Sequence, residues 1–239
     1  MQPSEIVDLR KAECPSCSGK LRKVPGAKTK CPGCGQFMFV RTRPDNTRVV
    51  VTKNEADQIE EEWSIARGYH DEYLAGKQIV IETRATLKKQ FGGKEPSEGD
   101  VQWALFNEEL MEHAAAGDWG LYRNSKLRMA EQLRKEEKFK YSFATYLEVC
   151  YLDLNGPRNN GGIRHDEELL RMYPPFSPNE SFLAPGLIRV LKRMMGLMAV
   201  DLFFVEDLYI EHNQEVCTRL GLPQSPNLNW PKLKAELTD

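Results

Sequence analysis

Apolar residues recur at intervals of three and four along most of the chain after residue 53, which is the period of amphipathic helices. Asn54 is a suitable N-cap for the first of these helices, because acidic residues follow it in the first turn. Ile59, Trp63 and Tyr73 continue the apolar pattern, and we expect this helix to end near Gly76.

The next segment, residues 79–91, has an ambiguous pattern. It begins with three β-branched residues that favour a strand, whereas its remainder suits a helix that Gly92 and Gly93 would stop. A loop then leads to a helix expected over residues 100–116.

The clearest helical unit lies between residues 119 and 154. Two sets of apolar residues each mark one helix face: Trp119, Tyr122, Met129, Ala130 and Leu133, then Phe139, Phe143, Leu147, Cys150 and Leu154. The charged turn 134–138 is so short that the two helices must pack as an antiparallel hairpin. With small Ala130 and Ser142 placed for close helix contact, this hairpin resembles a single tetratricopeptide repeat, although a generic helical hairpin is an open alternative.

The C-terminal third alternates between loops and apolar helices. Residues 155–162 predict a loop, whose arginines could form an anion-binding nest, and the prolines at 174, 175 and 178 indicate an extended segment. The apolar stretch 185–220 predicts two core helices that meet near Gly196, or alternatively an exposed methionine-rich groove for a partner helix. The tail predicts a loop and a final short helix.

The first 53 residues have a different pattern, with short apolar runs at 37–40 and 49–51 that favour strands. We therefore expect a mainly α protein, in which a small β domain (residues 1–45) and a connector (46–53) precede an all-helical domain of antiparallel hairpins (54–239).

Four cysteines in this N-terminal region form two C-x-x-C pairs, Cys14 with Cys17 and Cys31 with Cys34, thirteen residues apart. Each pair can hold one cation through two thiolates, and two such turns facing each other make a tetrahedral four-sulfur site, the geometry of structural zinc. We predict one structural Zn²⁺. Two disulfides, or an iron site of the rubredoxin type, are the alternatives.

The residues around the cysteines support the metal site. Gly35 directly follows the second pair, where positive φ lets backbone N–H groups turn toward sulfur, and Ser18 takes the equivalent place after the first pair. The strand 37–40 is expected to cover the metal. Together with Lys20-Leu21-Arg22 and Val24-Pro25, these residues make positions 11–43 resemble the small zinc-ribbon domains found at the N-termini of larger bacterial and archaeal proteins.

Charge is unevenly distributed along the chain, whose formal net charge is −2. Residues 1–53 contain 11 Lys+Arg and 4 Asp+Glu, whereas the rest contains 22 and 31. A basic ribbon could bind phosphate groups of nucleic acid, or instead an acidic surface of its own chain or of a partner. The contact residues we predict are Lys20, Arg22, Lys23, Lys28, Lys30, Arg41, Arg43 and Arg48.

Catalytic motifs are not evident. The chain has no phosphate-binding loop, no dinucleotide fingerprint and no G-x-S-x-G elbow. The acids adjacent to His70 and His165 do not share a helix face with them, and Glu109 with His113 lacks the register of carboxylate metal sites. We therefore expect no catalytic residues and no enzyme activity.

The leading hypothesis is a cytoplasmic adaptor. The cytoplasmic location is expected because neither an apolar signal peptide nor a run long enough to span a membrane is present. Its helical domain would bind a protein partner, and its basic ribbon would make a second contact. The alternatives are a nucleic-acid-binding protein that reads DNA or RNA through the ribbon, and an enzyme whose site is dispersed in sequence.

Overall fold

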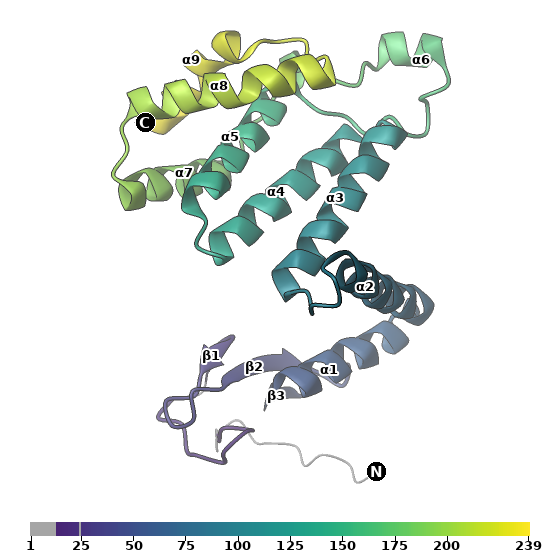
Figure 1. Cartoon of the computed structure of the whole chain (residues 1–239), viewed down its shortest axis with the longest axis vertical. Helices are drawn as coiled ribbons and strands as arrows, with labels where there is room; N and C mark the ends of the chain where they lie inside the picture. Colours follow the sequence, from purple (N-terminus) through teal and green to yellow (C-terminus); the bar gives the residue numbers. More distant parts are fainter. Residues whose placement is uncertain (1–12, 24) are drawn as a thin grey trace. The chain divides into compact units, whose positions relative to one another are not determined.

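The computed structural model describes residues 13–23 and 25–239, and it is mainly helical with a small three-stranded antiparallel sheet near the N-terminus (Figure 1). The fold class is therefore as predicted. Contacts between residues divide the chain into two compact units, one up to Glu82 and one from Thr83 to Asp239. We call them the N-terminal unit and the helical unit. Their boundary lies inside a helix, well beyond the residue-54 boundary expected from the sequence.

The N-terminal unit is built on the strands β1 (Thr29–Lys30), β2 (Phe37–Thr42) and β3 (Arg48–Val51), in the order β1-β2-β3. The segment expected to be a connector thus supplies the third strand, in which Val50 pairs with Val40. The helix α1 (Lys53–Ala66) packs against β2 and β3, where Ile59 joins a buried cluster with Val49 and Val51 of β3. The first helix therefore belongs to the sheet's unit.

The first helices differ from the sequence prediction in both start and end. Thr52 caps α1 through a capping box with Glu55, two residues before the expected cap Asn54. The chain turns at Gly68, whose φ is +76°, and α2 (His70–Gln90) then continues through Gly76 and through the ambiguous residues 79–81. A single glycine costs a helix only about 1 kcal/mol, so the expected break at Gly76 was wrong.

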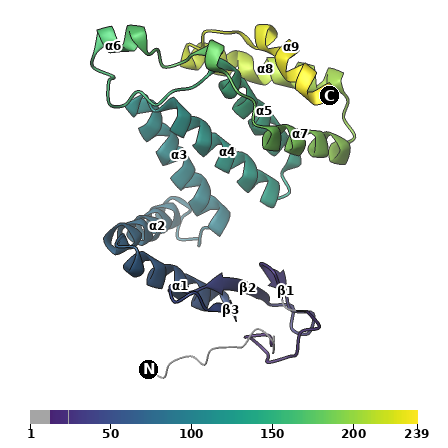
Figure 2. The same cartoon turned by 180° about the vertical axis from the view of Figure 1, so that it is seen from behind.

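In the helical unit, α3 (Glu98–Ala116), α4 (Trp119–Lys135) and α5 (Phe139–Asn155) follow one another, and each is antiparallel to the helix before it (Figures 1 and 2). The predicted hairpin is the pair α4 and α5. Its close contact is at the two predicted small residues: Ala130 and Ser142 are buried, and the Ser142 hydroxyl donates to the Ala130 carbonyl at 2.8 Å.

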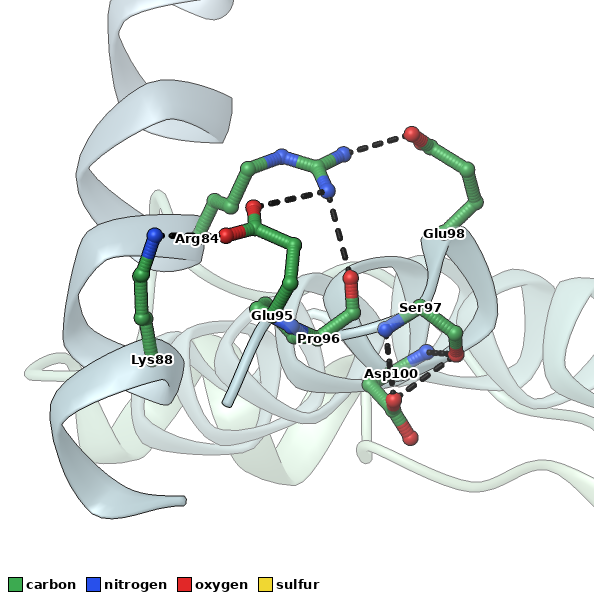
Figure 3. A network of polar contacts seen from close by, with 7 residues as sticks. All are labelled: Arg84, Lys88, Glu95, Pro96, Ser97, Glu98 and Asp100. Atoms are coloured by element: carbon green, nitrogen blue, oxygen red, sulfur yellow. Dashed lines mark hydrogen bonds and ion pairs between the residues drawn. The ribbon is translucent and has the colours of Figure 1, made fainter. Parts of the chain in front are cut away.

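Polar contacts fix the loop that leads from α2 into α3 (Figure 3). Arg84 of α2 donates to the Pro96 carbonyl at 3.3 Å and to the Glu98 carboxylate at 2.7 Å, while Lys88 pairs with Glu95. Ser97 then caps α3. The last turns of α2 are thereby tied to the start of α3.

The segment after α5 contains a short helix, α6 (Glu167–Met172), which the sequence analysis did not predict, and the 3-10 turn η2 (Pro178–Glu180). Gly156 ends α5 with φ +63°, and a Cβ there would lie 2.0 Å from the Ser177 carbonyl oxygen, so only glycine fits. The loop arginines are engaged within the chain: Arg158 pairs with Glu180, and Arg164 donates to the Ala115 carbonyl.

The remaining helices are α7 (Pro185–Met198), α8 (Leu202–Leu220) and α9 (Pro226–Thr238), and all three contact α5 or one another (Figures 1 and 2). The break between α7 and α8 comes at Ala199, in the left-handed region, rather than at Gly196. Met194 is buried, and Met195 and Met198 pack against the same core, so the prediction of core helices is confirmed.

Candidate metal centre and basic surface

Two matching turns hold the four cysteines. The Cys14 carbonyl accepts from Ser18 N–H while Cys14 N–H donates to Gly19, and Cys31 makes the same pair of hydrogen bonds with Gly35 and Gln36. Each turn has its left-handed residue at the equivalent place: Gly35 (φ +71°), as the sequence predicted, and Ser18 (φ +57°), which takes this conformation although it is not a glycine. The second turn lies between β1 and β2, which pair with each other.

The four sulfur atoms lie within 4.8 Å of one another. The Sγ atoms of Cys14 and Cys34 are 3.7 Å apart, and those of Cys17 and Cys31 are 3.9 Å apart. Zinc–sulfur bonds of about 2.3 Å in a tetrahedron place the sulfurs about 3.8 Å apart, so this donor set fits a four-sulfur metal site. Both separations far exceed the roughly 2.05 Å of a disulfide bond.

Electrostatics within the cluster favour a cation. The backbone N–H groups of Cys34 and Gly33 lower the pKa of the Cys31 thiol to about 6. The Gly19 N–H acts in the same direction on Cys17, but the neighbouring Cys34 and Cys14 sulfurs raise the pKa of Cys17 to about 12. One thiolate therefore forms readily and further ones repel it, which a divalent cation at the centre would reverse.

The strand β2 separates the metal site from the solvent-facing surface, because alternate residues of a strand point to opposite faces. Met38 is buried with Cys14, Cys31 and Val50, and thus covers the cysteines as expected. Phe37, which the sequence analysis also assigned to this cover, instead keeps 44% of its surface exposed.

Five of the eight predicted basic contact residues line one hollow of about 850 Å³ in the N-terminal unit: Lys20, Arg22, Lys23, Lys28 and Lys30. Among the described residues, no acidic side chain lines this hollow. The exposed Phe37 ring lies beside these cations, with the Lys28 Nζ 4.3 Å and the Lys30 Nζ 5.1 Å from its centroid.

The other three predicted contact residues are engaged within the N-terminal unit. Arg41 pairs with Glu60 of α1 at 3.4 Å, and Arg43 pairs with Glu62 at 3.3 Å. Arg48 donates to the Gly26 carbonyl at 3.1 Å. The structure thus separates the predicted patch into a five-cation hollow and three arginines with intramolecular partners.

Sequence reasoning missed two features. The first is the exposed Phe37, which the period-two alternation with the buried Met38 could have revealed. The second is the pairing of His212 with buried Glu148, 3.3 Å apart between Nε2 and Oε2. Only the position of an acid within the mainly apolar run 147–152 of α5 could have suggested it, since 64 residues separate the two.

In the part of the chain that the structure describes, the helices are too short or too polar to cross a bilayer. Comparisons with known protein families, with curated proteins and with solved structures find no match. Functional conclusions therefore rest on the cysteine cluster, the basic hollow and the helical unit themselves.

Proposed function

We propose that the protein is a zinc-ribbon protein that binds single-stranded nucleic acid through the basic hollow of its N-terminal unit. The cation is zinc because four thiolates in a tetrahedral arrangement are its usual structural ligands. Its role is to hold together the two turns that shape the hollow.

The observation that carries the proposal is the gathering of five cations around one hollow beside an exposed aromatic ring. Single-stranded nucleic acid is bound by basic grooves that follow the phosphates and by aromatic rings on which bases stack. Lys28 and Lys30 lie next to Phe37 and would meet phosphates on either side of a base stacked there. The exposed ring distinguishes this surface from one that attracts anions by charge alone.

Fluorescence anisotropy of labelled oligothymidylate and oligouridylate with the whole chain over a salt series tests the proposed binding. Lys28→Gln and Lys30→Gln should each reduce the slope of log K against log salt by about 0.7, since each removes one phosphate contact. Phe37→Leu should lower affinity about five- to hundredfold through lost stacking while the salt slope stays unchanged.

Arg41→Gln is the matched control, because Arg41 already pairs with Glu60. Its salt slope should equal that of the wild type. Absence of binding at low salt would contradict the proposal, as would an Arg41→Gln effect as large as that of Lys28→Gln. In that case the adaptor hypothesis, with a protein partner on the helical unit, becomes the better one.

A further inference from the structure

The helical unit contains a hollow of about 510 Å³ between α3, α4, α5 and α8. Its walls are largely apolar and come from all four helices, including Trp103, Met129, Ala144 and Leu208. Hollows of this size with apolar walls and a few convergent polar groups are typical of small-molecule binding sites.

Buried charge lies at one end of this hollow. The Glu148 side chain is 3% exposed, and its carboxylate faces Lys126 at 2.9 Å, His212 at 3.3 Å and Arg219 at 3.8 Å. A single carboxylate thus faces two permanent cations and a histidine. The local excess of charge is positive.

Lys140 adds a cation to the same wall. Lys140, Ala144 and Glu148 are four residues apart on α5 and therefore share one helix face. About 12 Å of helix separates the first from the last. Lys140 is exposed and makes no ion pair or hydrogen bond with the part of the chain that the structure describes.

A neighbouring hollow of about 600 Å³ provides an internal comparison. It shares Trp103, Leu133 and Tyr141 with the first hollow, but its charged lining has two acids, Asp100 and Glu136, and one cation, Lys138. The excess of cations therefore belongs to the hollow against α8 and does not extend over the whole groove.

We propose that the hollow between α3, α4, α5 and α8 binds a small amphipathic carboxylate, with its anionic head at Lys140 and its apolar chain along Ala144, Met129 and Leu208. Lys140, which has no anionic partner among the described residues, favours an anionic head group over a cationic one of the same shape. The apolar walls favour an alkyl or aryl body over a polar one. This site is separate from the nucleic-acid contact proposed for the N-terminal unit.

Titration calorimetry of the whole chain with octanoate, octanol and octylammonium tests the proposal, since the three probes share one chain and differ in head-group charge. Octanoate should bind tightest and octylammonium weakest. Lys140→Met retains the apolar stem of the side chain and should weaken octanoate binding about two- to fivefold, the value of an exposed ion pair. Ala144→Phe fills the hollow and should abolish binding.

Lys135→Met is the control, because Lys135 is exposed on α4 and lies outside the hollow. Its octanoate affinity should equal that of the wild type. Three results would overturn the proposal: no octanoate binding at millimolar concentration, equal affinity for octanoate and octylammonium, or unchanged affinity in both Lys140→Met and Ala144→Phe.

Discussion

Glu148 shows how a charged residue is accommodated in the core of the helical unit. Its burial acts to raise the pKa of the carboxyl group, but the hydrogen bond from His212 and the charge of Lys126 outweigh burial and hold the pKa below its ordinary value. The group is therefore ionised at neutral pH. Its neighbours Val149, Tyr151 and Leu152 are fully buried, so α5 presents almost no face to solvent here.

Glu148→Gln should destabilise the helical unit by about 3 kcal/mol, because it retains the shape of the side chain and leaves the nearly buried Lys126 without a counter-charge. A carboxyl whose pKa is depressed on folding stabilises the protein above its unfolded pKa, and that contribution is lost as pH falls through the folded pKa. The difference between wild type and variant should therefore be full above the ordinary value of 4.5 and shrink below it.

Urea unfolding of both proteins between neutral and acidic pH measures this difference. Glu215→Gln on the exposed surface of α8 is the control and should change the unfolding free energy by less than about 0.5 kcal/mol. A difference between wild type and Glu148→Gln that grew on acidification would contradict the assignment of an ionised Glu148.

The sequence allowed the structural role of some residues to be predicted, but not that of others. The four cysteines were predictable because turn geometry and metal coordination depend on local spacing. The left-handed Ser18 was predictable from its equivalence with Gly35. The partner of Glu148 was not, because a contact across 64 residues depends on how α5 and α8 pack, which no local pattern encodes.

Helix α3 depends on its N-terminal cap. The Ser97 hydroxyl accepts from Asp100 N–H at 3.1 Å, and the Asp100 carboxylate accepts from Ser97 N–H at 2.8 Å. Arg84 binds the preceding carbonyl, so the cap also ends the tied loop (Figure 3). The backbone N–H groups of Ser97 and Asp100, which would otherwise lack a hydrogen-bond acceptor, each bind the side chain of the other residue.

Ser97→Ala should lower the unfolding free energy of the helical unit by about 1 kcal/mol, since it removes the acceptor of the first-turn N–H. Thermal and urea unfolding followed by circular dichroism measure the change. Ser177→Ala is a matched control, because Ser177 precedes η2 but makes no side-chain cap. An equal decrease of the unfolding free energy in Ser97→Ala and Ser177→Ala would show that the Ser97 cap does not specifically stabilise α3.

Among the elements, predictability followed the strength of the amphipathic pattern. The hairpin of α4 and α5 was predicted within two or three residues because both helices have a clear buried face. In contrast, α2 has no buried residue in the described structure, so its apolar positions gave no helical face to recognise. Its Ile79 and Ile81 are exposed, and only their β-branched type, which favours strands, suggested a strand there.

At the scale of the whole molecule, charge is balanced within each unit more than the sequence alone suggested. Residues 1–82 contain 13 Lys+Arg and 12 Asp+Glu, and residues 83–239 contain 20 and 23. The acids that offset the basic N-terminal region lie mainly on α1 and α2, and two of them pair with Arg41 and Arg43. The basic hollow is thus a local feature of a nearly neutral unit.

The two units also differ in what stabilises them. Among the described residues, the N-terminal unit has two small buried clusters of four residues each: one around the cysteines, which includes the candidate metal ligands Cys14 and Cys31, and one between β3 and α1. The helical unit has a continuous core that includes α4, α5, α7, α8 and α9. Metal binding should therefore supply much of the stability of the N-terminal unit and little of the other, since structural zinc contributes about 10–16 kcal/mol in zinc-finger peptides.

Elemental analysis of protein purified without chelator should give one zinc per chain. Removal of the metal should increase amide hydrogen exchange in β1–β3 by orders of magnitude, because loss of the ligand bonds leaves too small a core to hold the sheet. Exchange in α4 and α5 should change little.

Cys31→Ser should reproduce the effect of the chelator, whereas the matched control Cys217→Ser, at a half-buried cysteine of α8, should retain the zinc. Less than one zinc per chain would contradict the zinc assignment, and faster exchange in α5 after chelation would show that the metal stabilises both units.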